Sequence, residues 1–184
     1  MHIAVTGTHG VGKTTLVEDL AESGRSFDLV PEPFLIFQDD DAFVDGPNTQ
    51  DLEVQLNQSC DLILDLSNEK SLVFDRCPLD FIAYLDVVSD AEGFDWTPSD
   101  EQLNRIEQAM EALDLVVFVP LLSDDEIESP NEYPQLRRRV DTRLKTILDD
   151  DDLGFFENDL RLLEICGPRD RRVANVLAEL ARKA

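Results

Sequence analysis

A glycine-rich stretch near the start of the chain holds the residue types best suited to phosphate chemistry. Residues 7–14 read Gly-Thr-His-Gly-Val-Gly-Lys-Thr, which is the G-x-x-x-x-G-K-T spacing of a P-loop. Glycines let a backbone wrap closely around an anion because no Cβ obstructs it, and the N–H groups of the loop then point at phosphate oxygens. The stretch therefore predicts a site for the phosphates of a nucleotide.

The P-loop residues have distinct expected roles. Lys13 should reach the β- and γ-phosphates, and the Thr14 hydroxyl should hold Mg²⁺. An apolar, β-branched run (2–6) precedes the loop and apolar residues at helical spacing (15–21) follow it, a context that a chance glycine turn would not need. We expect the nucleotide to be bound by Gly7, Thr8, His9, Gly10, Val11, Gly12, Lys13, Thr14 and Thr15.

A second set of candidates follows the apolar run at residues 71–74. Asp75 comes directly after this expected strand, where a carboxylate can couple to the water shell of Mg²⁺. Many P-loop ATPases place a glutamate next to activate water, but this chain has Arg76. A guanidinium cannot serve as a general base and suits an anion or an acceptor hydroxyl. The pair favours phosphoryl transfer to a bound acceptor over hydrolysis, and a strand-end salt bridge is the simpler alternative.

Further candidates lie where they could face an acceptor. Glu32 follows an expected strand at residues 27–31, and the carboxyl ends of parallel strands face the ligand crevice. Its carboxylate would then serve as a base or as a ligand of the acceptor hydroxyl. The alternative is an acidic residue in a surface turn. Asp80 and Tyr84, on the helix that begins at Pro78, are candidates to face the same pocket.

An arginine-rich helix is expected late in the chain. Residues 134–148 carry apolar residues on one side and arginines at 137, 138, 139 and 143, within a very acidic chain. Guanidinium groups neutralise the charge of a transferring phosphoryl group, so this helix predicts a lid over the phosphates. A solvated basic face is the alternative. We take Arg138 and Arg139 as the catalytic candidates, although the pattern alone does not separate the four arginines.

The remaining pattern predicts one α/β domain over residues 1–184. Five apolar runs alternate with helical patterns, which indicates a parallel sheet in a three-layer α/β/α sandwich. A lid-like helical segment is expected near residues 124–152. The turn at Gly167 and Pro168, after the last strand, would lie near the base of a bound nucleotide.

The charge of the chain narrows its expected partners and location. The chain has 40 acidic residues against 16 basic ones, a net charge of −24, which repels nucleic acid and anionic membranes. Either a high-salt cytoplasm that screens this charge or an ordinary acidic protein fits the composition. The three cysteines are isolated, as in a reducing compartment. Since a strand is expected from residue 2 and no apolar run reaches membrane-spanning length, we expect a cytoplasmic location without a leader peptide.

Several of these features together resemble the small P-loop nucleoside and nucleotide kinases. They are the P-loop, Glu-Pro at 32–33, Asp-Arg at 75–76, the arginine helix and the final Gly-Pro-x-x-x-Arg. The chain is also similar to the ATPase/kinase family associated with NAD metabolism, which contains ribosylnicotinamide-kinase-like domains, and to deoxynucleoside kinases. The resemblance implies a strand order of 2-3-1-4-5, with Glu32 as base and Arg76 as a ligand of the acceptor hydroxyl. Cys77 stands where deoxynucleoside kinases have a serine after Asp-Arg.

The sequence thus predicts a Mg-ATP-dependent phosphotransferase that acts on a small nucleoside-like or nucleotide-like acceptor. ATP and Mg²⁺ are the expected cofactors. A P-loop NTPase that hydrolyses or senses nucleotide without an acceptor is the alternative. Neither nucleic acid nor membrane is an expected partner, and a homodimer is one oligomeric state that the sequence leaves open.

Overall fold

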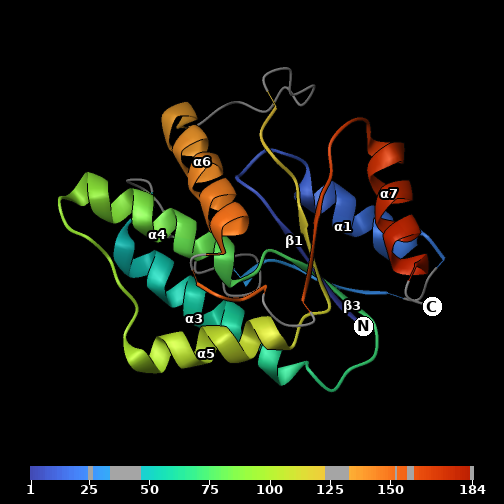
Figure 1. The fold of residues 1–184 in the computed structure, drawn as a ribbon, viewed down its shortest axis with the longest axis horizontal. Coiled ribbons are helices and arrows are strands. Elements are labelled where there is room, and N and C mark those ends of the chain that lie inside the picture. Colours follow the sequence, from blue (N-terminus) through green and yellow to red (C-terminus); the bar gives the residue numbers. More distant parts are fainter. Residues whose placement is uncertain (25–26, 34–46, 123–132, 152, 157–159, 183–184) are drawn as a thin grey trace.

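A five-stranded sheet lies at the centre of the computed structural model, with helices on both of its faces (Figure 1). The structure describes residues 1–24, 27–33, 47–122, 133–151, 153–156 and 160–182. All strand pairs are parallel and the order is β2-β3-β1-β4-β5, which confirms the predicted sandwich and strand order. The strands are β1 (His2–Thr6), β2 (Asp28–Val30), β3 (Leu72–Asp75), β4 (Leu115–Phe118) and β5 (Arg161–Glu164).

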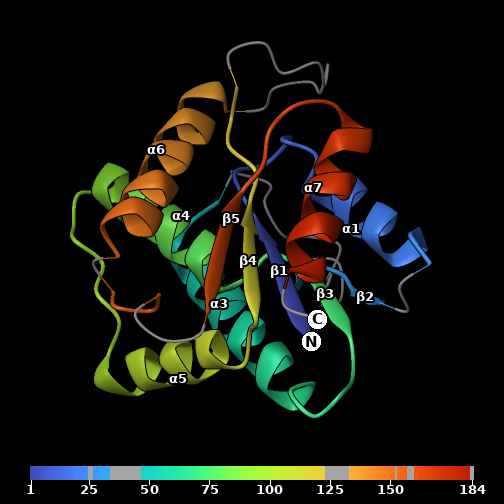
Figure 2. The same cartoon turned by 45° about the vertical axis from the view of Figure 1, so that its right-hand side comes forward.

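The described helices form two unequal layers. Helices α1 and α7 cover one face of the sheet, and α3, α4, α5 and α6 lie on the other side (Figure 2). Among these helices, none is both long and apolar enough to cross a membrane. The helices are α1 (Lys13–Glu22), α3 (Thr49–Asp65), α4 (Pro78–Glu92), α5 (Asp100–Glu111), α6 (Pro134–Asp150) and α7 (Arg169–Ala181).

The core follows from the alternation of side chains along the central strands. In β1, Ile3 and Val5 pack into the cluster that contains α1 and α7, whereas Ala4 packs into the larger cluster on the opposite face. Strands β1, β3 and β4 are buried along their whole length, which is why they read as continuous apolar runs rather than as alternating ones. Edge strand β5 alternates between half-buried and exposed residues.

The candidate residues meet at the carboxyl edge of this sheet. The P-loop follows β1, Glu32 follows β2, and Asp75 and Arg76 stand at the end of β3. Parallel strands end at the same edge, so segments far apart in sequence come together there. Helix α6 forms most of the segment expected as a lid, residues 124–152; residues 124–132 and 152 of that segment lie outside the described residues.

Candidate functional site

The P-loop connects β1 to α1, and its shape requires its glycines. A Cβ at Gly7 would lie 2.5 Å from the carbonyl oxygen of Val119, closer than packed atoms come. Gly10 and Gly12 have φ angles of 71° and 89°, in the left-handed region that favours glycine. Gly12 is also the N-cap of α1, so the loop ends at a helix N-terminus, where anions bind favourably. Thr15 lies half-buried in the first turn of that helix.

Three cationic side chains hold the carbonyl groups of P-loop residues 8–11. Lys13 Nζ donates to the first carbonyl at 2.9 Å, the Arg137 guanidinium to the second and third at 2.8 Å each, and the Arg172 guanidinium to the fourth at 2.7 Å. The C=O and the N–H of a trans peptide point in opposite directions. The N–H groups of residues 10–12 therefore point away from the Arg137 and Arg172 guanidinium groups, and a phosphate would meet them on the opposite side of the loop.

Lys13 is a buried lysine whose pKa is set by opposing effects of its surroundings. The residue is 5% exposed. Burial, followed by the positive charge of Arg76, lowers the pKa of its ammonium group to about 8, and the carboxylates of Asp80, Asp75 and Glu32 oppose this shift. Lys13 is therefore charged at neutral pH and loses its proton in mildly alkaline solution.

Thr14 and Asp75 form a pair of oxygen ligands beside the P-loop. The Thr14 hydroxyl donates to Asp75 Oδ2 at 2.6 Å, and the residue Asp75 is 3% exposed. Asp75 Oδ1 is buried and has no hydrogen-bond partner in the described part of the chain, and burial raises the pKa of this carboxyl group. A buried carboxylate oxygen without a partner is costly, which a cation or its water shell would relieve.

This donor set fits Mg²⁺. Magnesium is a hard cation that is held by one or two carboxylates together with substrate phosphates and water, rather than by a full protein cage. Within the described ranges, no group of three or more His, Cys, Asp and Glu side chains could hold a metal ion. The hydroxyl of Thr14 and the carboxylate of Asp75 are the residues that would hold Mg²⁺ on a bound nucleotide.

Arg76 stands between two carboxylates at the end of β3. Its Nε donates to Glu32 Oε2 at 2.5 Å and its Nη1 to Asp80 Oδ1 at 3.3 Å, while the guanidinium lies 5.8 Å from the centre of the Tyr84 ring. The backbone of Arg76 has φ = 82°, a strained conformation for a residue other than glycine. Such strain persists only where the surrounding structure enforces it, and it is common at functional sites.

The pairing keeps Glu32 and Arg76 ionised. Burial alone would raise the pKa of the Glu32 carboxyl group, but the charge and hydrogen bond of Arg76 more than offset this and lower the pKa. Burial likewise opposes the charge of Arg76, and the carboxylate of Glu32 raises the pKa of the guanidinium above its usual range. The site therefore presents a fixed anion beside a fixed cation at neutral pH.

Helix α4 is joined directly to the P-loop. Asp80 is fully buried, and its Oδ1 accepts a hydrogen bond from the Gly7 N–H at 3.1 Å. Its Oδ2 accepts from the Cys77 N–H at the start of α4, also at 3.1 Å. One turn later, the Tyr84 hydroxyl lies 2.8 Å from Nδ1 of His9 and accepts from the His9 N–H at 3.2 Å. Asp80 and Tyr84 thus lie against the P-loop, and their expected place beside an acceptor stays a prediction.

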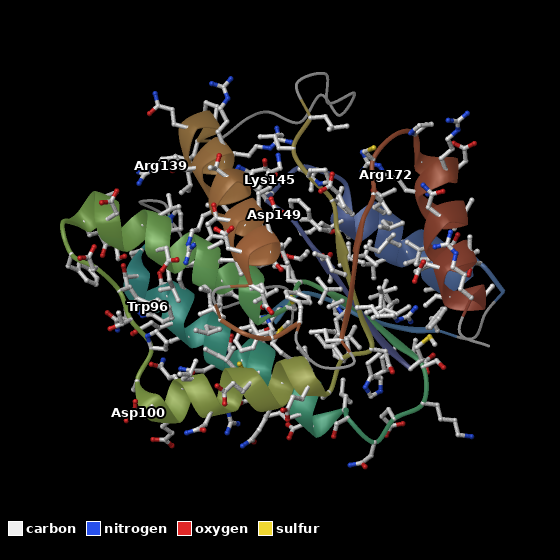
Figure 3. All side chains as sticks on the ribbon, in the orientation of Figure 1. Trp96, Asp100, Arg139, Lys145, Asp149 and Arg172 are labelled. Atoms are coloured by element: carbon white, nitrogen blue, oxygen red, sulfur yellow. The ribbon has the colours of Figure 1, made fainter. Side chains whose placement is uncertain are left out.

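Helix α6 presents Arg137 to the P-loop rather than the two arginines selected from the sequence. Arg137 is 5% exposed and binds the loop carbonyls as described above. Arg138 is exposed, and Arg139 donates to Asp90 at 2.6 Å on the surface (Figure 3). The spacing of apolar residues along the helix could have identified Arg137, because it precedes Val140 by three residues and so shares the buried side of the helix.

The turn after β5 approaches the P-loop through Arg172. This arginine donates to the Gly167 carbonyl at 2.7 Å and, from the same guanidinium, to the Val11 carbonyl. Gly167 has φ = 92°, and Pro168 is the N-cap of α7. The turn formed by Gly167 and Pro168 is thereby tied to the P-loop; its expected place near the base of a bound nucleotide stays a prediction. Sequence reasoning assigned Arg172 no role, although it ends the Gly-Pro-x-x-x-Arg pattern.

The fold is that of P-loop nucleoside and nucleotide kinases. Deoxyadenosine kinase from M. mycoides with bound dATP is 14% identical, has a TM-score of 0.65, and is matched over 98% of this chain and 100% of its own. Thymidylate kinase from Candida albicans is 17% identical, with a TM-score of 0.64 over 99% of this chain and 91% of that one. Shikimate kinase from Acinetobacter baumannii in complex with shikimate is 15% identical, with a TM-score of 0.54 over 99% and 94%.

These likenesses confirm the predicted resemblance to P-loop kinases in fold. Residues 2–157 match the family described as AAA domain, and the chain belongs to that family. No curated protein is significantly similar to the chain.

Proposed function

We propose that the protein is a Mg-ATP-dependent phosphotransferase that acts on a small nucleoside-like or nucleotide-like acceptor. The observation that carries this proposal is the fixed pair of Glu32 and Arg76, held beside the Mg²⁺ candidate Asp75 at the carboxyl edge of the sheet. Arg76, which follows Asp75 in the sequence, cannot activate water as a base, but its guanidinium can bind an oxygen of the acceptor. The kinase folds of the similar structures support this direction.

In this proposal the P-loop and its flanking residues hold the nucleotide. The N–H groups of the loop and Lys13 bind the phosphates, while Thr14 and Asp75 hold Mg²⁺, which neutralises charge on the phosphates when bound. The turn at Gly167 and Pro168 lies on the base side. Each of these roles uses a group whose position is already held by a neighbouring hydrogen bond.

Glu32 and Arg76 would bind the acceptor in this arrangement. The ionised carboxylate of Glu32 accepts a hydrogen bond from the acceptor hydroxyl and takes its proton as the phosphoryl group transfers. Because Arg76 lowers the pKa of Glu32, the carboxylate is a weak base and acts mainly by orienting the hydroxyl. A loose, metaphosphate-like transition state needs no stronger base.

We assign the role of the α6 arginine that acts at the P-loop to Arg137 in place of Arg138 and Arg139. Arg137 lies on the loop that would hold the phosphates, and it adds positive charge there while it holds the loop carbonyls. Charge that is fixed before the reaction stabilises a phosphoryl transition state without reorganisation. Arg138 and Arg139 extend from the exposed side of the same helix.

Hydrolysis without an acceptor is the second candidate function. The match to the family described as AAA domain is compatible with this function as well as with phosphotransfer. The two functions differ in how the rate depends on an acceptor. If the protein is a kinase, the hydroxyl of the acceptor is the nucleophile. ADP release should then be slow until an acceptor binds.

The test is ADP release from Mg-ATP, measured alone and with a panel of nucleosides, nucleotides and ribosylnicotinamide. We expect at least one acceptor to raise the rate tenfold or more, which is about 1.4 kcal/mol in the barrier. The Lys13→Ala variant, checked for folding by circular dichroism, is the control and should show no turnover. A rate that no acceptor changes, but that Lys13→Ala abolishes, would identify the protein as an NTPase.

A further inference from the structure

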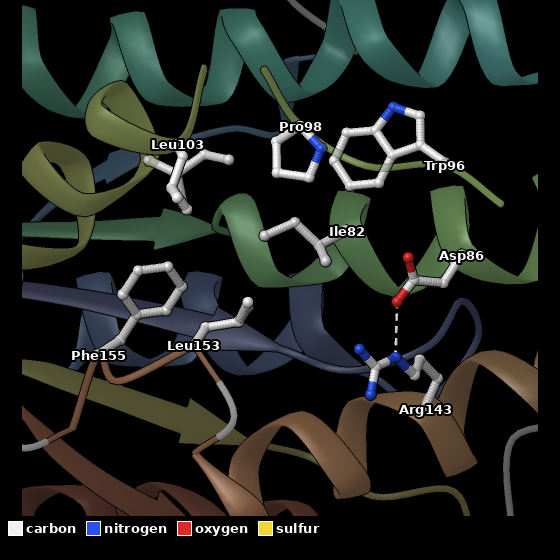
Figure 4. Close-up of a pocket in the computed structure, with 9 residues that line it drawn as sticks. Ile82, Asp86, Trp96, Pro98, Leu103, Arg143, Leu153 and Phe155 are labelled. Carbon is white, nitrogen blue, oxygen red and sulfur yellow. Dashed lines mark hydrogen bonds and ion pairs between the residues drawn. The ribbon is translucent and has the colours of Figure 1, made fainter. Parts of the chain in front are cut away.

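A cavity of about 160 Å³ lies among α4, α5, α6 and residues 153–155 (Figure 4). Most of its wall is apolar. Asp86 and Arg143 stand at one end of it and are joined by a hydrogen-bonded ion pair at 2.6 Å. The apolar wall includes Ile82, Trp96, Pro98, Leu103, Leu153 and Phe155.

The walls of the cavity are held in place from outside it. The Trp96 indole donates to Glu53 Oε1 at 2.8 Å, and the Trp96 backbone N–H donates to the Ser89 hydroxyl at 3.3 Å. On the opposite wall, the Phe155 N–H donates to Asp151 Oδ1 at 2.8 Å. Aromatic walls that are fixed in this way keep a space open, whereas well-packed interiors leave few voids larger than a water molecule.

The cavity stands apart from the P-loop but shares two helices with it. On α4, Asp80 contacts the loop and Asp86 lies six residues further on, about 9 Å along the helix axis. On α6, Arg137 contacts the loop and Arg143 likewise lies six residues beyond it. The ion pair of the cavity is thus separate from the groups assigned to nucleotide and acceptor.

We propose that this cavity is a second ligand site, which takes a single-ring aromatic molecule with a planar edge that both accepts and donates hydrogen bonds, as a carboxamide does. A dry cavity of about 150 Å³ is large enough to bind benzene, so one ring fits here. The carbonyl oxygen of such a ligand would accept from Arg143 and its N–H would donate to Asp86. In this arrangement the ligand binds beside the ion pair of Arg143 and Asp86, which stays intact.

The side chains of Arg143 and Asp86 are 28% and 25% exposed, so the polar end of the site reaches solvent and gives the ligand a way in. A ring that enters there would lie between Trp96 and Phe155. Binding at this site needs no nucleotide, so the proposal does not depend on the proposed phosphotransfer.

The test is a fluorine NMR titration with para-fluorobenzamide, compared with para-fluoroacetophenone. The two probes have nearly the same shape, but the ketone cannot donate a hydrogen bond. We expect the amide to bind with a dissociation constant of about 1 mM or tighter, and about two- to tenfold more tightly than the ketone. Asp86→Leu, which removes the acceptor of the amide N–H, should reduce this preference, whereas Arg143→Gln should weaken the binding of both probes alike.

Leu103→Phe fills the half-buried side of the cavity and should weaken amide binding at least tenfold. Leu64→Phe makes the same change at a half-buried position on α3, outside the cavity, and should leave binding unchanged. If Leu103→Phe does not fold, the amide should still shift the methyl signals of Ile82, Leu103 and Leu153 in the unaltered protein. Absent binding, equal binding to both variants, or equal affinity for the two probes would each overturn the proposal.

Discussion

Replacing Glu32 with glutamine removes one negative charge from the acceptor side while it keeps the shape of the side chain. The amide oxygen can still accept from Arg76 Nε, where the carboxylate accepts at 2.5 Å. Metal binding should be spared, because the Mg²⁺ candidates Thr14 and Asp75 are hydrogen-bonded to each other and not to Glu32. The variant therefore separates the acceptor role from the nucleotide role.

The expected loss of transfer rate in Glu32→Gln depends on how strong a base the Glu32 carboxylate is. A general base is commonly worth 10²–10⁴ in rate. Arg76 lowers the pKa of Glu32 and so weakens it as a base, and a loose transition state needs little proton abstraction. We therefore expect the low end, a loss of about 10² in the transfer step, which is about 2.7 kcal/mol in the barrier.

The assay combines isothermal titration with Mg-ATP and single-turnover transfer to an acceptor found in the panel. Asp19→Asn is the matched control, because Asp19 is also a carboxylate held by an arginine, Arg169, but it lies on α1 away from the site. The control should change neither quantity. If Glu32→Gln weakens Mg-ATP binding and spares the transfer step, Glu32 is a metal or structural residue and the reasoning is refuted.

Three further predictions concern the metal, the lysine and the surface charge. Asp75→Asn should raise the Mg²⁺ concentration needed for half-maximal nucleotide binding, and an unchanged requirement would remove Asp75 from the metal site. Because the pKa of Lys13 is lowered to about 8 in the ligand-free protein and phosphate favours its charged form, nucleotide affinity should fall by up to about tenfold per pH unit above 8; a flat titration would contradict this. The thermal midpoint should rise between 0.1 and 1 M KCl, since the Debye length falls from about 10 to about 3 Å and screens the charge of −24; a falling midpoint would exclude a high-salt adaptation.

The sheet and the P-loop were predictable from the sequence because both depend on local patterns. Buried parallel strands read as apolar runs, and the glycine positions at 7, 10 and 12 match backbone conformations that other residues rarely adopt. The carboxyl ends of the strands then follow from the topology alone. For this reason Glu32, Asp75 and Arg76 could be placed at one edge before their contacts were known.

The contacts among these residues were not predictable, since they join segments distant in sequence. Glu32 and Arg76 are 44 residues apart, and Gly7 and Asp80 are 73 apart. The positive φ angle of Arg76 is set by these tertiary contacts and leaves no local pattern. Only the folded chain shows that the acceptor candidates and the P-loop share Asp80.

In helix α6, the charge of Arg137 made its position on the buried side of the helix hard to recognise from the sequence. Arg137 lies on the buried side with Val140, but an arginine at an apolar position reads as surface because isolated charges are rarely buried. The loop carbonyls that Arg137 binds compensate for its burial. Arg138 and Arg139 stood out in the sequence equally well, although they lie on the exposed face.

The fate of the γ-phosphoryl group distinguishes phosphotransfer from hydrolysis. ATP labelled at that position, incubated with excess protein, Mg²⁺ and the acceptor panel for a single turnover, partitions its label between an acceptor and inorganic phosphate. We expect the label to appear mainly on one acceptor, and we expect Arg76→Met to shift it towards inorganic phosphate or to stop the reaction. Label that passes wholly to inorganic phosphate whatever acceptor is present would contradict phosphotransfer.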